Sequence, residues 1–367
     1  MRVVIAPDSF GGTLTAQQAA EAIATGWART RPHDELVLLG MSDGGEGLLD
    51  VVGAADPGLQ HHEVEVAGPR GLPVTATWLG GERVAVVESA QACGLSLLAP
   101  GDRDPLLTTT HGVGELLESV RATGVRRILV GLGGSATVDG GAGALTGLGM
   151  RLRRADGSGV KVGGGWVGDT DRVEPGWIAT EWDDVTVDLL ADVTTPLADA
   201  AAVFGPQKGA DEQAVATLAA GMDRWAAVVE RDLDRPGLAR RPGTGAAGGL
   251  AFGLAAALGG TVKAGAPVVA DLVGLDAALR DADFVVTGEG RVDATSHAGK
   301  VVSEIAQRAH TFDVDWALVA GGGAAPQGVV AEWSAPDGPG TDPAGEVASA
   351  GARLAARFTD GGASPRA

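Results

Sequence analysis

The sequence predicts an α/β protein in which both chain ends form a parallel-sheet domain and the middle forms an inserted mixed α/β domain. Near both ends, β-branched runs alternate with helical patterns, whereas the middle holds short alternating segments typical of antiparallel strands. A chain of 367 residues is also too long to fold around one small hydrophobic core. We place the parallel domain at residues 1–62 and 265–367 and the inserted domain at residues 63–264.

The N-terminal segment predicts a strand, a loop and a helix. "RVVIAP" is a short β-branched run, and after a loop Ala19, Ile23 and Trp27 recur with helical spacing. Thr15 and Gln18 have the spacing of a capping box, which predicts the start of this helix. "DELVLLGMSDGGEG" then supplies a second strand that ends in an acidic, glycine-rich loop.

The same order returns near the C-terminus. A strand in "ADFVVTGEGRVDATSHAGK" precedes the helical "VVSEIAQRA", and "DWALVAGGG" predicts another strand. Strands that alternate with helices indicate a parallel sheet, whose loops gather at the carboxyl ends of the strands. We expect "WSAPDGPGTDPAGE" to be a loop and "DGGASPRA" to be a frayed tail.

The middle of the chain begins with three alternating segments, "HHEVEVAG", "LPVTATWLG" and "RVAVVESAQ". The short separators "PRG" and "GGE" predict an antiparallel meander. After it we expect the helix "VGELLESVRATG", strands in "RRILVGLGG" and "VTVDLLADV", and a long helix from Asp211 to about Leu233. In that helix Leu218, Met222 and Trp225 belong to one apolar stripe, which predicts core packing.

Charge and cysteine content exclude several classes of protein. The formal net charge of −19 argues against nucleic-acid binding, and an anionic substrate must therefore meet a local cluster of donors. A single cysteine, Cys93, excludes a disulfide within the chain and a thiolate metal cage, and it fits a reducing cytoplasm. The apolar run in "MRVVIAPDSF" is too short for a signal peptide or a membrane span, so we expect no membrane partner.

Several glycine-rich loops follow predicted strands and carry acidic or hydroxyl side chains. They are "APDSFGG", "MSDGGEG", "GLGGSATVDGG" and "TGEGRVDATSHAGK". Glycines let backbone N–H groups approach an anion, and a following helix N-terminus adds a favourable dipole. Carboxylates in the same loops would repel a bare phosphate unless Mg²⁺ lay between them. The combination indicates phosphoryl transfer with a magnesium nucleotide.

Each of these features has a structural alternative. No loop matches Walker A, and the G-x-G-x-x-G spacing in "GTGAAGG" follows "RRP" rather than a strand, which disfavours a dinucleotide-dependent dehydrogenase. One glycine-rich loop by itself can be a simple turn. Ser9 can cap the first helix instead of binding substrate. Lys208 and Lys300 can be surface lysines, but only four lysines are present and both lie in glycine-containing polar loops.

Taken in chain order, seven motifs resemble the bacterial glycerate kinase family of the glycerate 2-kinase type, from residue 2 to about residue 325. They are "APDSF", "MSDGGEG", "VGLGGSATVDGGAGAL", "DVTTPL", "AAVFGPQKGA", "GTGAAGGLAFGL" and "DLVGLDAALRDADFVVTGEGRVDATSHAGK". The resemblance implies a flavodoxin-like domain from the two chain ends, an inserted restriction-endonuclease-like domain and a cleft between them. It also implies transfer of the γ-phosphate of ATP to the 2-hydroxyl of D-glycerate.

We therefore predict an ATP- and Mg²⁺-dependent kinase for D-glycerate or a related small hydroxy acid. The predicted catalytic residues, with Asp8 or Asp293 as the base and the cations as charge neutralisers, are Asp8, Asp192, Asp293, Lys208, Arg291 and Lys300. The predicted nucleotide contacts are Gly133, Gly134, Ser135, Thr137, Asp139 and Glu289. The predicted substrate contacts are Ser9, Asp43, Glu46 and Ser296, and the predicted Mg²⁺ ligands are Asp43 and Asp192. The expected partners are the nucleotide, the hydroxy acid and a second copy in a homodimer.

The chain also departs from the family's pattern. Gly11 stands where the family has a lysine, and Val138 and Thr195 stand where it has asparagines. Loss of one cation at a phosphate site costs on the order of a hundredfold in rate, and neither Val nor Thr offers an amide's paired donor and acceptor. Two hypotheses stay open: a kinase retuned to another hydroxy acid, and a catalytically impaired homologue that binds or senses a small acid or acts as a scaffold protein.

Overall fold

The computed structural model describes residues 1–176, 178–292, 300–323, 329–334 and 342–358. Contacts within the chain divide it into two compact units. Unit 1 holds Met1–Asp43, Asp50–Pro57 and the described residues from Gly265 onward, and unit 2 holds Gly44–Leu49 and Gly58–Ala264. Each unit has its own sheet, as the predicted α/β class requires. The predicted border at residues 62 and 63 stays a prediction, and strand β3 (Gln60–Ala67) lies whole in unit 2.

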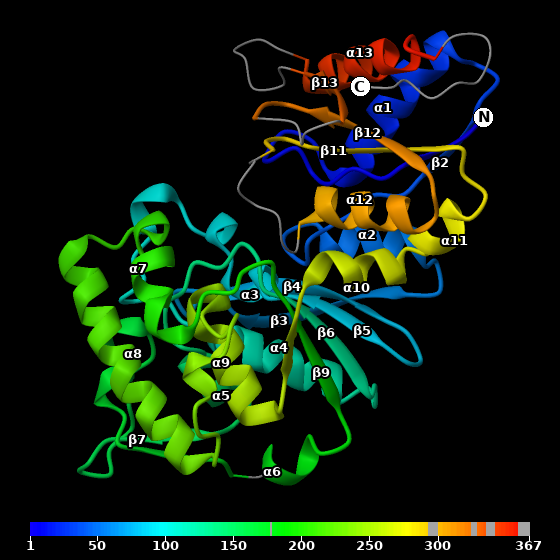
Figure 1. Cartoon of the computed structure of the whole chain (residues 1–367). Helices are drawn as coiled ribbons and strands as arrows, with labels where there is room; N and C mark the ends of the chain where they lie inside the picture. The colour runs from blue at the N-terminus through cyan, green and yellow to red at the C-terminus, as the bar shows by residue number, and fades with distance from the viewer. Residues whose placement is uncertain (177, 293–299, 324–328, 335–341, 359–367) are drawn as a thin grey trace. The chain divides into compact units, whose positions relative to one another are not determined.

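Unit 1 is built around a five-stranded parallel sheet with the order β13-β12-β11-β1-β2 (Figure 1). Its strands are β1 (Arg2–Ile5), β2 (Glu35–Leu38), β11 (Phe284–Glu289), β12 (Asp315–Ala320) and β13 (Val330–Trp333). Its helices are α1 (Ala16–Thr30), α10 (Gly265–Leu272), α11 (Leu275–Leu279), α12 (Val301–Thr311) and α13 (Pro343–Ala355), while α2 (Leu48–Ala55) begins in unit 2. The strand order reverses between β1 and β11, which is the flavodoxin-like arrangement.

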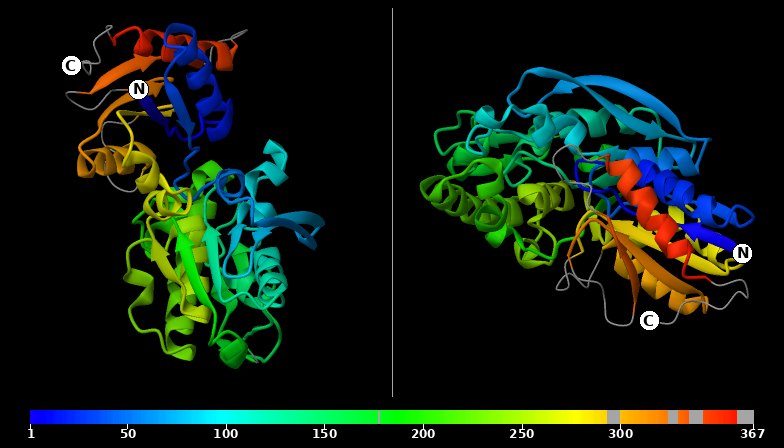
Figure 2. Two further views of the ribbon diagram at one scale, coloured as in Figure 1. Left: turned by 90° about the vertical axis from the view of Figure 1, so that its right-hand side faces the viewer. Right: turned by 90° about the horizontal axis from the view of Figure 1, so that it is seen from above.

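Helices cover both faces of this sheet, which explains why its central strands are continuously apolar. Ile5 and Val319 pack with α1 and α13 on one face, whereas Leu318 packs with Val302 of α12 on the other. Helices α1 and α13 lie side by side (Figures 1 and 2), and a Cβ on Gly26 would stand 1.8 Å from a backbone oxygen of α13. The predicted capping box of α1 is confirmed.

Unit 2 is built around a six-stranded mixed sheet with the order β10-β9-β6-β5-β4-β3. Its strands are β3, β4 (Pro73–Gly80), β5 (Ala85–Glu88), β6 (Arg127–Gly131), β9 (Thr186–Leu190) and β10 (Thr261–Lys263), and β7 (Arg151–Arg153) pairs separately with β8 (Arg172–Glu174). Its α-helices are α3 (Ala90–Cys93), α4 (His111–Arg121), α5 (Ala142–Gly147), α6 (Ile178–Glu181), α7 (Ala200–Phe204), α8 (Glu212–Asp232) and α9 (Ala246–Leu258). The antiparallel meander predicted for β3, β4 and β5 is confirmed.

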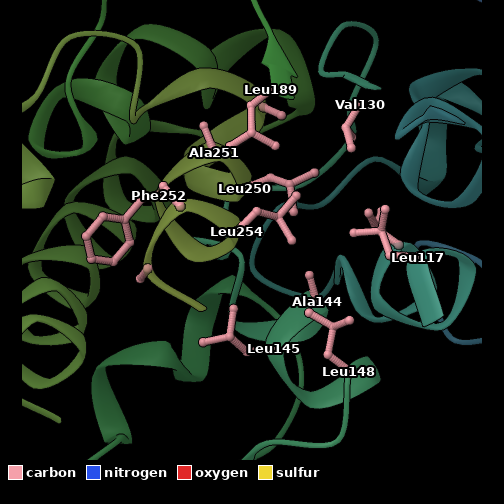
Figure 3. Packing of buried hydrophobic residues seen from close by; sticks show 14 of the residues in the cluster. Leu117, Val130, Ala144, Leu145, Leu148, Leu189, Leu250, Ala251, Phe252 and Leu254 are labelled. Atoms are coloured by element: carbon pink, nitrogen blue, oxygen red, sulfur yellow. The ribbon is translucent and has the colours of Figure 1, made fainter. Parts of the chain in front are cut away.

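The core of unit 2 lies where α9 packs between the sheet and α5. Figure 3 shows Leu250 and Leu254 of α9 between Leu189 of β9 and Leu145 of α5. The predicted long helix is confirmed as α8, which is capped by the Asp211 side chain. Among the stripe residues of that helix, Leu218, Met222 and Trp225 are buried as predicted.

The sequence missed strand β13 and helix α13. The loop expected over "WSAPDGPGTDPAGE" is wrong at its end, because α13 begins at Pro343. Proline suits the first turn of a helix, but alanine and glycine then dominate its buried face and weaken the apolar pattern. The expected tail "DGGASPRA" lies outside the described residues. Among the helices that the structure describes, none combines the length and apolarity that a bilayer crossing requires.

Candidate functional site

The first group of predicted residues lies in unit 1 at the carboxyl ends of its strands. Asp8 follows β1, Asp43 follows β2 and Glu289 ends β11, and we call these three residues the carboxylate cluster. The Asp8 N–H donates to the Gly288 carbonyl oxygen at 2.8 Å, and the Met41 N–H donates to the Pro7 oxygen at 2.9 Å. These bonds hold the cluster at the point where the strand order reverses, the usual ligand site of such sheets.

The pKa values of Asp8 and Glu289 in the carboxylate cluster are raised. Burial raises the pKa of Asp8 to about 7, the charges of Asp43 and Glu289 add to that rise, and the Ser9 N–H, 2.6 Å from Asp8 Oδ1, opposes it. Burial also raises the pKa of Glu289, against the opposing charge of Lys300. Asp8 is therefore close to half-protonated at neutral pH, which suits a carboxylate that takes a proton during catalysis.

Some of the other predicted residues of unit 1 lie next to this cluster, and one is exposed to solvent. Ser9 is half-buried beside Asp8, and the alternative that it caps the first helix is wrong, because Thr15 is the N-cap of α1. Lys300 is half-buried and lies close enough to favour the charged form of Glu289, whereas Arg291 is exposed. The predicted residues Asp293 and Ser296 lie outside the described part of the chain.

The second group lies in unit 2 on residues 131–143, which we call the glycine-rich loop. The Leu95 N–H donates to the Gly134 oxygen at 2.8 Å, and the Ala136 N–H donates to the Cys93 oxygen at 2.7 Å. A Cβ on Gly133 would stand 2.5 Å from the Gly45 Cα, so this approach requires glycine. Gly134 is exposed with a φ of +69°, and its backbone is the accessible tip of the loop.

Glu46, predicted to bind substrate, is exposed next to this tip. Its Oε2 lies 3.9 Å from the position that a Cβ on Gly134 would occupy. The structure therefore brings Glu46, Gly133 and Gly134 together within unit 2.

Lys208 reaches the same loop from inside the unit. Its Nζ donates to Ser135 Oγ at 2.8 Å and to the Thr137 oxygen at 2.8 Å, and the residue is only 2% exposed. Burial lowers the pKa of Lys208 to about 8, although the neighbouring Cys93 and Asp139 favour its charged form. No carboxylate of the described residues lies within ion-pair distance of this ammonium. Lys208 therefore binds the loop from its buried side and holds it in place.

Asp139 and Thr137 also face the interior. Asp139 is fully buried and accepts hydrogen bonds from the backbone N–H groups of Thr110, Gly141 and Gly143 and from the Thr110 hydroxyl. Burial raises the pKa of Asp139, and these hydrogen bonds oppose the rise. The Thr137 hydroxyl is buried without a hydrogen-bond partner in the described structure. These contacts place both side chains on the buried side of the loop, whereas its backbone is exposed at Gly134 and half-buried at Gly133.

The motif "GTGAAGG" supports the loop by close backbone packing. A Cβ on Gly248 would stand 2.0 Å from the Thr137 oxygen, and one on Gly249 would stand 2.7 Å from the Gly140 Cα. Ala247 shares their positive φ, at +53°. The glycine spacing therefore serves tight packing at the start of α9 rather than the dinucleotide fingerprint.

The carboxylates suit Mg²⁺ that also binds phosphate oxygens, rather than a cage made of protein ligands alone. Within the described residues, no group of three or more His, Cys, Asp or Glu side chains is arranged to hold a metal ion. Of the two predicted Mg²⁺ ligands, Asp43 lies in unit 1, and the half-buried Asp192 lies in unit 2, after β9. Mg²⁺ commonly takes one or two carboxylates with phosphates and water.

The three departures from the family pattern occupy different environments. Gly11 is exposed with a φ of +26°, and a Cβ there would meet no atom within 4 Å. Val138 is fully buried in the core of unit 2. Thr195 is half-buried, and its carbonyl oxygen accepts a hydrogen bond from the Gly245 N–H at 2.9 Å.

Arg103 is a candidate that sequence reasoning missed. Its Nε is buried and has no hydrogen-bond partner in the described structure. The surrounding "GDRDP" gave no signal, because an arginine between two aspartates is typical of a solvated turn. Only the structure reveals that this side chain has unused donors.

Known proteins resemble this chain over most of its length. A model of the glycerate kinase family matches residues 3–333. The glycerate 2-kinase of Escherichia coli K12 is 37% identical over 318 residues, which cover 84% of this chain and 83% of that protein. A glycerate kinase of Halalkalibacterium halodurans is 39% identical over 324 residues, which cover 87% and 85%.

A crystal structure from Salmonella typhimurium LT2, assigned as a glycerate kinase 2, has a TM-score of 0.84 at 35% identity and covers 97% of both chains. This likeness confirms the predicted fold class. Together with the family match, it shows that the chain belongs to the glycerate kinase family, whose members are kinases that phosphorylate an alcohol group.

Proposed function

We propose that this protein transfers the γ-phosphate of ATP to the 2-hydroxyl of D-glycerate and forms 2-phosphoglycerate and ADP. The family and the names of the relatives support glycerate as the acceptor. The observation that carries the mechanism is the carboxylate cluster, in which Asp8 has a pKa of about 7 beside Asp43 and Glu289. Such a carboxylate accepts a proton near neutral pH without a large energetic penalty.

In the proposed reaction, the acceptor hydroxyl oxygen forms a bond to the γ-phosphorus while the bond between that phosphorus and the β,γ-bridging oxygen breaks. The proton of the hydroxyl passes to the Asp8 carboxylate. The backbone N–H groups of Gly133 and Gly134 bind phosphate oxygens, and Lys208 and Ser135 hold this part of the loop in place. Lys300 and Arg291 compensate negative charge near the cluster, and Glu46 and Ser9 orient the acceptor.

Mg²⁺ would be held by Asp43 and Asp192 together with phosphate oxygens, and it supplies charge neutralisation to the transferring phosphoryl group. The cleft between two domains and the homodimer, both expected from the sequence, stay predictions.

One experiment tests activity, acceptor and position together. The protein is incubated with Mg-ATP and a set of small hydroxy acids, and the products are read by phosphorus NMR. D-glycerate 2-phosphate as the main product supports the proposal, while phosphorylation of another hydroxy acid supports a retuned kinase. Phosphate at the 3-position refutes the proposed regiochemistry.

Gly11 favours a second candidate function, a homologue that binds a small acid without turnover, because the loop after β1 lacks the family's cation. Calorimetry with Mg-ATP and D-glycerate, run beside an ADP-release assay, separates the two functions. Binding of both ligands without ADP release supports the second function. ADP release that depends on D-glycerate refutes it.

A further inference from the structure

We propose that Arg103 binds an oxyanion of the reactants, either a nucleotide phosphate or the carboxylate of the acceptor, beside the glycine-rich loop. This inference rests on the proposed function, because it assigns Arg103 to the ligands of the same reaction. It adds a cation to the site at a position that neither the motifs nor the comparisons single out.

The first observation is that the Arg103 guanidinium has unused donors. The residue is half-buried, its Nε is shielded from solvent, and its side chain has no hydrogen bond or ion pair in the part of the chain that the structure describes. Other arginines of unit 2 are paired, as Arg121 is with Glu118 and Arg127 is with Asp188. A buried donor without a partner is destabilising, so an arginine in this state is suited to a ligand that satisfies it.

The second observation is that both chain flanks of Arg103 are tied to the glycine-rich loop. Upstream, the Leu95 N–H donates to the Gly134 oxygen at 2.8 Å. Downstream, the Thr108 hydroxyl donates to the Ala136 oxygen at 2.9 Å. The intervening segment, including Arg103, is therefore anchored at two points to the loop whose tip is open to a ligand.

The third observation is a close backbone contact between Arg103 and the segment that carries Lys208. Gly209 has a φ of +97°, and a Cβ there would stand 2.4 Å from the Arg103 carbonyl oxygen. Gly209 directly follows Lys208, whose ammonium already bonds to Ser135 and Thr137. The two cations therefore come from touching segments, but only Arg103 keeps its donors unused.

A guanidinium matches an oxyanion with two parallel N–H donors, which an ammonium does not provide. Because Lys208 is 2% exposed and occupied by the loop, we assign the ligand-binding role to Arg103 and the positioning role to Lys208. A phosphate of the nucleotide and the carboxylate of the acceptor both present the required pair of oxygens. The experiment therefore measures the two ligands separately.

The test compares wild-type protein, Arg103→Gln and Arg103→Lys by calorimetry with Mg-ADP and with D-glycerate, each alone. Arg83→Gln is the matched control, because Arg83 is exposed in the turn between β4 and β5. We expect Arg103→Gln to weaken one ligand at least tenfold and the other less than twofold, which identifies the oxyanion. Arg103→Lys is expected to recover part of the lost affinity, and Arg83→Gln is expected to bind as wild type.

Equal affinities of wild type and Arg103→Gln for both ligands overturn the inference and leave the proposed function intact. Wild-type protein that binds neither ligand overturns the proposed function, and the inference with it. An equal loss of affinity for both ligands in Arg103→Gln, with no recovery of affinity in Arg103→Lys, also overturns the inference, because that result indicates a structural role for Arg103. If Arg103→Gln does not fold by circular dichroism, Arg103→Lys decides, and unchanged affinities in it overturn the inference.

Discussion

The ammonium nitrogen of Lys208 lies 2.8 Å from the hydroxyl oxygen of Ser135. This contact joins one of the four lysines of the chain to the loop that carries the half-buried Gly133 and the exposed Gly134. Because the lysine is buried, it cannot meet a phosphate directly unless the loop moves. In the proposed function, this contact fixes the backbone of the loop before the nucleotide binds, which lowers the entropic cost of ordering it.

We expect Lys208→Met to weaken nucleotide binding by roughly tenfold to a hundredfold, because the two hydrogen bonds that order the loop are lost. Calorimetry with Mg-ADP measures this effect. Lys161→Met serves as the control, because Lys161 is an exposed lysine of the same unit. Unchanged affinity in Lys208→Met would show that the loop is ordered without the lysine.

Lys208 also predicts a pH dependence of stability. Its pKa is about 8 in the folded protein against an ordinary value of 10.5, so the folded state binds fewer protons than the unfolded state between these values. The contribution of this group to the free energy of unfolding therefore rises with pH from about 8 to about 10.5. Denaturant titrations at several pH values are expected to show a smaller rise in Lys208→Met than in wild type. Identical slopes would contradict the proposed burial of the charge.

We expect Asp8→Asn to lower kcat by about 10²–10⁴, because an amide cannot take the hydroxyl proton. In wild type, kcat/KM is expected to rise with pH through about 7 as Asp8 ionises. Ser9→Ala is the matched variant beside it, and we expect it to alter KM for the acceptor and to move the pH profile upward, because the Ser9 side chain also lowers the pKa of Asp8. Full kcat in Asp8→Asn would exclude Asp8 as the base.

The same substitution is expected to stabilise the fold above pH 7. The pKa of Asp8 is raised from 3.8 to about 7, so the folded state holds a proton that the unfolded state has lost, and this group's contribution to stability falls as pH rises through that window. Since Asp8 is only half-buried, we expect a gain of about 1–2 kcal/mol in the free energy of unfolding of Asp8→Asn at pH 8. A loss of stability there would contradict mutual repulsion in the carboxylate cluster.

We expect Gly11→Lys to increase turnover of D-glycerate, because it restores the cation that the family carries at this position. The side chain has room, but the φ of +26° is unfavourable for lysine and is expected to cost about 1–2 kcal/mol of stability. Gly12→Lys, with a φ of +76° and equally open surroundings, is the control. Equal kcat/KM values in both variants would show that position 11 has no specific role.

Gly248→Ala is expected to destabilise unit 2 by about 3 kcal/mol or more and to weaken nucleotide binding, because its Cβ would stand 2.0 Å from the Thr137 oxygen. Gly124→Ala has a similarly positive φ but meets no atom within 4 Å, so its cost is limited to backbone strain. Thermal unfolding of both variants separates packing from strain. Equal melting temperatures would refute the close packing beneath the loop.

Sequence reasoning succeeded where a local pattern has one dominant physical cause. The capping box at Thr15 and the apolar stripe of α8 were predicted because helix periodicity and capping are local properties. The meander was predicted because alternation and turn residues mark hairpins. Helix α13 was missed because small residues on its buried face weaken the apolar pattern on which such prediction depends.

For the site residues, the sequence predicted which side chains matter chemically but not where they lie. Sequence motifs named Lys208, Asp139 and Thr137 as chemically important, but they gave no information on whether those side chains face solvent. The structure places all three under the glycine-rich loop. Arg103 was not predicted, because whether a donor lacks a hydrogen-bond partner depends on its neighbours in three dimensions, which the sequence does not give.

By itself, the amino-acid sequence determined the α/β class, the position of the glycine-rich and acidic loops at strand ends, and the resemblance to glycerate kinases. Only the tertiary structure decided that the pKa of Asp8 lies near neutrality and that Lys208 is buried. The physical reason is that strand periodicity and turn chemistry act over a few neighbouring residues. Desolvation and charge repulsion depend instead on groups that lie dozens or hundreds of positions away in the chain.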